Sequence, residues 1–370
     1  MTARYLDPQT GETFALDVPR WCGPNRAPLL LTPQSGLTRS DVHTTTRSLW
    51  RYRAAFALPV QDPITLGEGC TPLVPRIFPG SGAKAYAKCE WFNPTGSFKD
   101  RGASVMLSAL RAQGIDAVLE DSSGNGGAAI SAYAAAGGLR ATILAPASTS
   151  PAKTVQMRAH GASVELVPGT RQDTADAAVA KSETVFYASH NWHPFFLEGT
   201  KTLAYELWED FGFRAPDNVI IPCGAGSNVL GCDIGFSELL RAGQIERLPR
   251  LFAAQPVHCA PIAASLLGQE LPILPTIAEG TAIAQPIRLA EVRAALERSG
   301  GGAVTSTEAE IAQATLELAK MGLYVEPTSA QAASAFVKLL ASGAIRPDET
   351  TVLVLTGSGL KATARISDLV

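Results

Sequence analysis

Short apolar runs alternate with helix-like segments along most of the chain, and this alternation limits the fold more than any other feature. The runs expected to form strands are bounded by Gly, Pro or polar turn residues; they are 83–91, 116–122, 140–145, 162–167, 218–223, 250–255 and 350–357. Helical patterns occupy 102–114, 126–138, 199–212, 308–322 and 328–343. The sequence therefore predicts an α/β fold in which mostly parallel sheets are covered on both faces by helices.

The composition limits the partners of the chain. With 370 residues, 46% of them hydrophobic and 18% charged, it can bury a large core, and we expect two globular units. Because the net charge is −3 and no long basic run occurs, we expect a small-molecule partner and no nucleic acid. No apolar run of about 18 residues occurs, and the N-terminus MTARYLDPQTGE lacks the apolar core of a signal peptide. We therefore expect a cytoplasmic protein without a membrane partner.

The six cysteines are scattered without CxxC spacing; they are Cys22, Cys70, Cys89, Cys223, Cys232 and Cys259. This pattern favours reduced thiols over a disulfide framework or a zinc site.

Three Gly/Ser-rich loops follow predicted strands, namely DSSGNGG (121–127), PCGAGSNVLG (222–231) and LTGSGLKA (355–362). In α/β folds, ligands bind where strands end and helices begin, because backbone N–H groups and the helix dipole converge there. Glycines have no Cβ, so the backbone can approach an anion closely. One such loop is a weak signal, since turns need glycine anyway. Three together predict a ligand site.

A fourth segment, FNPTGSFKDRG (92–102), places Lys99 among small and hydroxyl-bearing residues. A lysine at a strand-to-helix junction and partly removed from water has a reason to lose its proton and become a nucleophile. An ordinary exposed lysine that pairs with Asp100 or Glu90 is the commoner outcome. The residues alone leave both interpretations open.

Taken in order, FNPTGSFKDRG, SSGNGG, GAGSN and TGSGLK resemble the fold-type II pyridoxal-phosphate enzymes, most closely the threonine synthase-like group. The resemblance covers nearly the whole chain and implies two parallel-sheet, three-layer domains of the tryptophan synthase β-like kind. The implied domains are an N-terminal extension over 1–60, a large cofactor-binding domain over 61–107 and 203–370, and a small domain over 108–202. The resemblance does not fix the oligomeric state, and a homodimer is one candidate.

The resemblance also implies the roles of individual residues. Lys99 would hold pyridoxal phosphate as a Schiff base and act as general base, Asn125 would lie beside the phenolic oxygen, and Thr356 would face the pyridine nitrogen. The cofactor phosphate would be bound by the loop Gly224, Ala225, Gly226, Ser227 and Asn228. Substrate contacts would come from Ser123, Gly126, Gly127 and Ser358. No metal is expected, because the cysteine-rich ribbon of many such enzymes retains here only Cys22, and one thiolate cannot form a tetrahedral zinc site.

Two functions follow from the resemblance. The first is a threonine synthase-like reaction that converts O-phosphohomoserine to threonine and phosphate. Gly126 and Gly127 stand where synthases usually have Thr-Ser, so the second is a serine/threonine dehydratase or another β-eliminating ammonia-lyase. A protein that binds the cofactor without catalysis is a third, from a different class. Candidates for a substrate-phosphate site are Lys153, Arg158, His190 and His193, although such histidines are more often packing residues.

Overall fold

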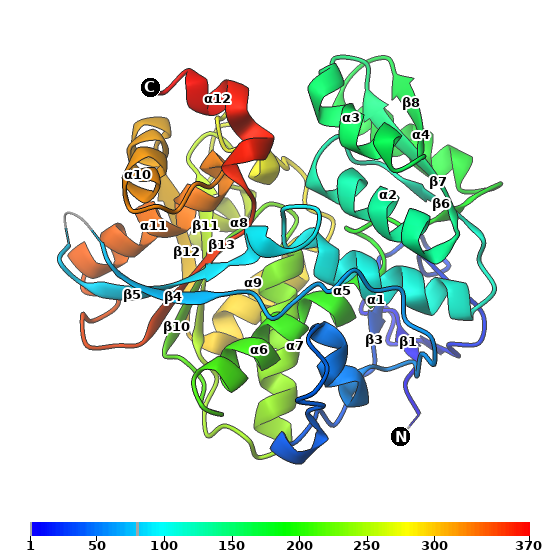
Figure 1. Cartoon of the computed structure of the whole chain (residues 1–370), viewed down its shortest axis with the longest axis horizontal. Helices are drawn as coiled ribbons and strands as arrows, with labels where there is room; N and C mark the ends of the chain where they lie inside the picture. Colours follow the sequence, from blue (N-terminus) through cyan, green and yellow to red (C-terminus); the bar gives the residue numbers. More distant parts are fainter. Residues whose placement is uncertain (1, 79–80) are drawn as a thin grey trace. The chain divides into compact units, whose positions relative to one another are not determined.

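The structure is a computed structural model that describes residues 2–78 and 81–370, and contacts within the chain divide it into two compact units (Figure 1). The first unit comprises Met1–Leu37, Asp41–Glu68 and Lys99–Thr200, and the second comprises Thr38–Ser40, Gly69–Phe98 and Lys201–Val370. The chain thus passes from the second unit into the first between Phe98 and Lys99. The domain boundaries expected from the sequence stay a prediction.

A four-stranded parallel sheet forms the centre of the first unit, in the order β8-β7-β6-β9. Its strands are β6 (Ala117–Glu120), β7 (Arg140–Pro146), β8 (Ser163–Val167) and β9 (Phe186–Tyr187). The helices are α1 (Lys99–Ala112), α2 (Asn125–Gly137), α3 (Pro151–Ala159), α4 (Arg171–Lys181) and α5 (Pro194–Thr200). Helix α1 packs against α2 and α5, and their apolar faces join the β6 and β7 side chains in one buried cluster.

The N-terminal part of the first unit carries a small antiparallel sheet in the order β2-β1-β3. Its strands are β1 (Tyr5–Leu6), β2 (Thr13–Phe14) and β3 (Leu30–Leu31). Tyr5 is fully buried, and its ring lies edge-on to Phe195, with 5.9 Å between ring centroids. Cys22 is a free thiol, and the described residues include no group of three or more His, Cys, Asp or Glu side chains that could hold a metal ion.

A six-stranded sheet forms the second unit, in the order β12-β11-β10-β13-β5-β4, and only β4 runs antiparallel to its neighbour (Figure 1). Its strands are β4 (Leu73–Ile77), β5 (Lys84–Cys89), β10 (Asn218–Pro222), β11 (Arg250–Pro256), β12 (Gly302–Ser306) and β13 (Thr351–Leu355). The helices are α6 (Thr202–Asp210), α7 (Ser227–Arg241), α8 (Pro261–Leu267), α9 (Leu289–Ser299), α10 (Glu308–Lys320), α11 (Pro327–Ala341) and α12 (Thr363–Ser367). Helix α11 packs along the central strands, α10 packs on α11, and α7, α8 and α9 contact β11.

Short 3₁₀ turns occur at η1 (Arg39–Asp41), η2 (Leu49–Ala55), η3 (Glu90–Phe92), η4 (Glu279–Thr281) and η5 (Gly359–Ala362). No helix in the described part of the chain is both long and apolar enough to cross a bilayer.

The parallel α/β architecture predicted from the sequence is confirmed. Strands β10 and β13 are buried along their whole length, which explains their nearly continuous apolar runs. Strands β4, β9 and β12 were not predicted, because they are short, contain a proline or alternate with polar residues.

Lys88 of β5 is a fully buried cation that ties the sheet of the second unit to α6. Its Nζ donates to the Thr71 carbonyl, to Glu206 Oε1 and to Asp210 Oδ2, each at 2.7 Å. Three donors meeting three oxygens is the full complement of an ammonium group, and this pairing offsets much of the cost of burying the charge.

We expect Lys88→Met to lower the free energy of unfolding by about 3–5 kcal/mol, because it removes the cation that balances the charge of the buried Glu206 carboxylate. Lys84→Met is the matched control, since Lys84 is exposed on the same strand, and it should change stability by less than about 0.5 kcal/mol. Urea denaturation measures both. Equal effects of the two variants would contradict this account, and Glu206→Gln added to Lys88→Met should restore part of the loss.

Candidate functional site

Backbone hydrogen bonds hold the segment that leads into Lys99. Ser97 forms an antiparallel bridge with Gly357, and the Phe98 N–H donates to the Thr356 carbonyl at 3.0 Å. Helix α1 begins at the next residue, Lys99. The two residues before Lys99 are therefore held by backbone contacts with the end of β13.

The Lys99 side chain is half-buried at the first turn of α1, and its Nζ lies 5.6 Å from the centroid of the Phe196 ring. The same ring occupies the space beside Gly102, where an added Cβ would come within 2.4 Å of ring atoms. Gly102 therefore makes room for Phe196, and Phe196 covers one side of the lysine amine.

Gly126 and Gly127 follow Asn125 in the first turn of α2, and both are glycines for steric reasons. A Cβ at Gly126 would lie 2.8 Å from Nδ1 of His190, and one at Gly127 would lie 2.2 Å from the Ser122 carbonyl oxygen. A threonine or serine at either position would displace these groups. The histidine thus occupies the space in which a residue-126 side chain would stand.

The other predicted residues of this loop lie at its turn. Ser123 is half-buried, and its hydroxyl makes no hydrogen bond within the described part of the chain. Asn125 is half-buried as the first residue of α2. Both lie in the connection between the end of β6 and α2, where ligands bind in parallel α/β sheets.

Glu120 ends β6 directly before this loop and is fully buried. Its Oε1 lies 2.9 Å from His190 Nδ1, and its Oε2 accepts the His190 backbone N–H at 3.0 Å. Its Oε1 also accepts the Asp121 N–H at 3.0 Å. The Asp121 carboxylate in turn accepts the Tyr187 hydroxyl at 2.6 Å. The result is a buried acidic cluster around one imidazole.

Burial changes the protonation of this cluster. It raises the pKa of Glu120 to about 7, although the Lys99 charge and the bond from His190 act in the opposite direction. Burial, with the neighbouring Glu120 charge, raises the pKa of Asp121 to about 6. Burial and the Lys99 charge hold the pKa of His190 well below its usual value.

The predicted phosphate loop joins β10 to α7 in the second unit. Gly226 is the N-cap of α7 with φ +93°, and no side chain caps this helix end. A Cβ at Gly226 would also come within 2.2 Å of Val292, so glycine is required here. Helix N-termini of this kind attract anions through backbone N–H groups and the helix dipole.

Asn228 lies in the first turn of α7 and is 2% exposed. Its side-chain Nδ2 and Oδ1 are both buried without a hydrogen-bond partner in the part of the chain that the structure describes. A buried amide that lacks both partners is costly. It indicates that a polar ligand completes its hydrogen bonding.

Residues 280–283 form a wall beside this loop. A Cβ at Gly224 would lie 3.0 Å from Thr281 Cα. The wall is held by the Gly280 N–H, which donates to Thr328 Oγ1 at 3.0 Å, and by Gln331 Nε2, which donates to Thr281 Oγ1 at 2.8 Å. The remaining residues of the loop, Ala225 and Ser227, are half-buried and buried respectively.

Thr356 is buried at the end of β13, with its Oγ1 3.0 Å from Ser329 Oγ. Ser329 Oγ also accepts the Gly357 N–H at 2.9 Å. These side chains present neutral hydroxyls at the position predicted to face a pyridine nitrogen. Ser358 has a different place, because its Oγ accepts the Leu360 N–H at 3.2 Å and caps η5.

The candidates for a substrate-phosphate site differ in exposure and in their contacts. Lys153 and Arg158 are exposed on α3. His193 is buried, stacks on Phe195 and accepts the Phe195 N–H at Nδ1. His190 already pairs with a carboxylate. Two of these side chains are thus exposed and two are buried in other contacts, so the structure gives no support for an anion site built from all four.

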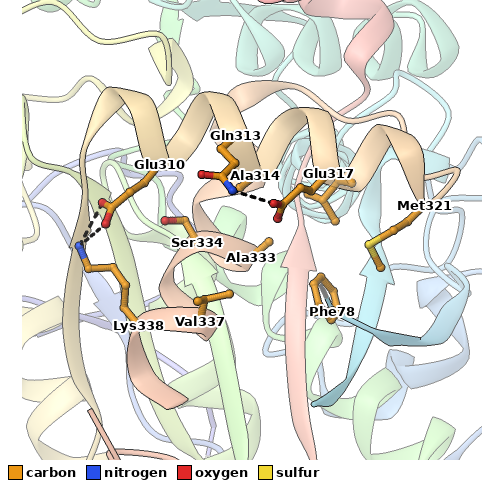
Figure 2. A pocket seen from close by; sticks show the side chains of 11 residues that line it. Phe78, Glu310, Gln313, Ala314, Glu317, Met321, Ala333, Ser334, Val337 and Lys338 are labelled. Atoms are coloured by element: carbon orange, nitrogen blue, oxygen red, sulfur yellow. Dashed lines mark hydrogen bonds and ion pairs between the residues drawn. The ribbon is translucent and has the colours of Figure 1, made fainter. Parts of the chain in front are cut away.

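Two hollows lie away from these residues. One, of about 140 Å³, lies between α10 and α11 of the second unit (Figure 2). Its polar groups already pair with one another, as Lys338 does with Glu310 at 3.0 Å and Gln313 with Glu317 at 2.9 Å. The other, of about 460 Å³, is lined by residues of β6, β7 and α2 in the first unit. Neither hollow is lined by a predicted site residue.

Residues 64–357 match the family model described as "Pyridoxal-phosphate dependent enzyme". The chain belongs to this family. The threonine synthase of Methanosarcina acetivorans is 34% identical over 87% of this chain and 82% of the relative, and that of Mycobacterium leprae is 34% identical over 87% and 92%. The threonine synthase of Methanocaldococcus jannaschii is 36% identical over 85% and 80%.

Solved structures confirm the fold. A processed threonine deaminase isoform from Solanum lycopersicum has a TM-score of 0.69 and 21% identity over 91% of this chain and 95% of the other. An L-serine ammonia-lyase from Rhizomucor miehei has a TM-score of 0.69 and 21% identity over 81% and 97%. The fold-type II architecture predicted from the sequence is therefore correct, and the chain is a pyridoxal-phosphate-dependent enzyme.

The residues present fit this cofactor. An uncapped helix N-terminus and a buried amide without partners suit its phosphate, and a neutral hydroxyl pair suits an unprotonated pyridine nitrogen. The assignment of single residues to these contacts stays a proposal. Sequence reasoning missed Ser329 and Glu120, and it considered His190 only as a packing residue or a phosphate ligand. An acidic residue that ends a buried strand directly before a glycine loop was the available signal for Glu120.

We expect Asn228→Leu to separate cofactor binding from stability. The variant should raise the dissociation constant of pyridoxal phosphate at least about tenfold, because it removes the amide that the ligand would satisfy. The cofactor-free protein should be no less stable, since the amide has no partner there. Fluorescence titration and urea denaturation measure these two quantities.

Asn218→Leu is the matched control, because Asn218 lies at the opposite end of β10 and donates to Glu349 and Thr351. It should lower the free energy of unfolding by about 1–3 kcal/mol without changing cofactor affinity. The account is wrong if Asn228→Leu leaves the affinity for the cofactor unchanged.

Proposed function

We propose that the chain is a threonine synthase-like enzyme that converts O-phosphohomoserine to threonine and phosphate. The observation that carries this proposal is the identity of 33–36% to threonine synthases over more than four fifths of the chain. The start of α1 at Lys99 and the neutral hydroxyls at Thr356 support it.

Lys99 is the residue that would hold the cofactor and move the substrate's Cα proton. When bound, pyridoxal phosphate withdraws electrons from the substrate Cα and so makes its C–H acidic. The substrate amine would replace the lysine amine, which then accepts the Cα proton and later returns one. Phe196 shields this amine on one side, which keeps water from part of its surface.

The remaining contacts would position the cofactor. The backbone N–H groups of residues 224–228 and the Asn228 amide would bind its phosphate, and Asn125 would donate to its phenolic oxygen. Thr356, paired with Ser329, would leave the pyridine nitrogen unprotonated. A weaker electron sink favours elimination and replacement over transamination.

A serine/threonine dehydratase or related ammonia-lyase is the second candidate, and two observations favour it. Gly126 and Gly127 supply no hydroxyl to a substrate phosphate. His190 pairs with Glu120, and its pKa is held well below its usual value by burial, so this cluster offers no positive charge to a substrate phosphate. We also infer a cytoplasmic enzyme, because its cysteines form no disulfide bond within the described part of the chain. Its oligomeric state is not assigned, and a homodimer is one candidate.

A panel of amino acids tests the proposal. We expect the holoenzyme to release phosphate and threonine from O-phosphohomoserine, with little ammonia or keto acid from L-serine and L-threonine. Phosphate, ammonia and keto acid are scored separately, and Lys99→Ala is the control, because it should abolish every activity. Ammonia and keto acid without phosphate would replace the synthase with the ammonia-lyase. Turnover by Lys99→Ala would refute both.

A further inference from the structure

The buried pair of Glu120 and His190 has no catalytic role in the proposal above. It borders two parts of the proposed site, the ring that covers Lys99 and the first turn of α2. His190 packs edge-on to the Phe196 ring, with 5.7 Å between centroids, and Lys99 Nζ contacts the same ring. His190 Nδ1 also lies 2.8 Å from the position of a Gly126 Cβ. The imidazole therefore adjoins the ring that covers the lysine and the helical turn that begins at residue 125.

Hydrogen bonding leaves one nitrogen of this imidazole available. Nδ1 lies 2.9 Å from Glu120 Oε1, and the backbone N–H of His190 donates to Oε2 of the same carboxyl group at 3.0 Å. Within the described part of the chain, Nε2 makes no hydrogen bond. Two contacts to one carboxyl group fix the ring plane and the direction in which Nε2 points, as in other oriented histidine bases.

The pair has two protonation states that differ at Nε2. At net charge zero, one proton lies between Glu120 and Nδ1 and a second lies on Nε2, so Nε2 is a donor. At net charge −1, the remaining proton lies on Nδ1 and is donated to the carboxylate, so Nε2 is an acceptor. The pair acts as one acid, wherever the inner proton lies.

We propose that this pair is the general acid that protonates the departing oxygen of the substrate, with His190 as a catalytic residue and Glu120 as its positioning residue. The inference rests on the proposed function, because it requires Lys99 to accept the Cα proton. The carbon–oxygen bond of the leaving group breaks with both electrons going to oxygen, and the electrons of the neighbouring C–H bond form a carbon–carbon double bond as Lys99 accepts its proton. This C–H bond is at Cα for a β-leaving group and at Cβ for the γ-phosphate of O-phosphohomoserine. The Nε2 proton passes to the departing oxygen, and the pair changes from charge zero to −1. The pair regains a proton from solvent as Lys99 releases one to it.

The surrounding charges suit a proton transfer near neutral pH. The groups that act on the pair are Lys99 of α1, Asp121 after β6 and Arg171 of α4, and Tyr187 of β9 donates to Asp121. Burial raises the pKa of Glu120 to about 7. The neutral form of the pair, which carries the donor, therefore prevails below about pH 7 and is lost as the pH rises. A general acid works best when its pKa lies near the working pH.

His190→Gln tests the inference, because glutamine retains a side-chain N–H but cannot transfer its proton. For holoenzyme acting on O-phosphohomoserine, or on L-serine or L-threonine if the panel shows that it turns these over instead, we expect kcat to fall by about 10²-fold or more. For β-chloro-L-alanine, kcat should stay within about threefold of wild type, since chloride leaves without a proton. His160→Gln, at the end of α3 in the same unit, is the matched control and should change neither reaction.

Two further measurements separate this inference from the proposed function. Proton NMR in D₂O follows exchange of the Cα hydrogen of L-alanine, which needs Lys99 but no leaving group. His190→Gln should retain this exchange and Lys99→Ala should lose it. In wild type, kcat/KM for the oxygen substrates should decline above about pH 7, and Glu120→Gln should remove that decline.

Each outcome supports or overturns the inference. Equal losses by His190→Gln with oxygen and chloride leaving groups, or loss of Cα exchange, would make the pair structural. Unchanged kcat for the oxygen substrates would show that another group donates the proton. If wild type itself exchanges no Cα hydrogen, the proposed function fails, and the inference fails with it.

Discussion

The backbone contacts of residues 97–98 with residues 356–357 are the constraint on which the candidate site depends. The Phe98 N–H donates to the Thr356 carbonyl at 3.0 Å, and Ser97 bridges Gly357. These bonds join the segment before the lysine to the end of a fully buried central strand. Side-chain substitutions do not remove these backbone bonds. The position of the residues that precede Lys99 therefore depends on the main chain. Ser329 reinforces this junction by accepting the Gly357 N–H at 2.9 Å.

Two buried charged groups show how polar side chains are satisfied by partners within this chain. Lys88 meets three oxygens, and the buried Glu68 carboxylate accepts the Ser104 hydroxyl at 2.6 Å and the Tyr133 hydroxyl at 2.9 Å. These groups stabilise packing and need no ligand. Asn228, by contrast, keeps both amide atoms without a partner beside an uncapped helix end. Of the described residues, Asn228 is the one whose amide nitrogen and oxygen are both buried without a partner, and this is why we assign it to the cofactor.

Much of the fold could be predicted from the sequence, because strands buried on both faces read as continuous apolar runs. The loops that follow such strands could also be predicted, because they are rich in glycine and serine. Strand β12 could not, since its half-buried GAVTS carries no such signal. The pairing of Glu120 with His190 could not either, because 70 residues separate them and only the sheet topology brings them together.

The structure gives a steric reason for glycine at position 126. The sequence alone presents it as a missing hydroxyl, whereas the structure places the His190 ring in the space of its absent side chain. The missing side chain at position 126 and the place of the imidazole are thus linked by packing. That link connects loop sequence, packing and chemistry, and no pattern within the loop could have shown it.

The central claim is that Lys99 holds the cofactor, and reduction of the holoenzyme with borohydride tests it most directly. Reduction fixes pyridoxal phosphate to the lysine that carries it, and proteolysis with mass spectrometry then locates the added mass. The account predicts the label on Lys99, within the peptide that contains FNPTGSFKDRG. Label on another lysine would contradict it, for example on Lys361, whose Nζ donates to the Thr95 carbonyl at 2.9 Å near the same junction.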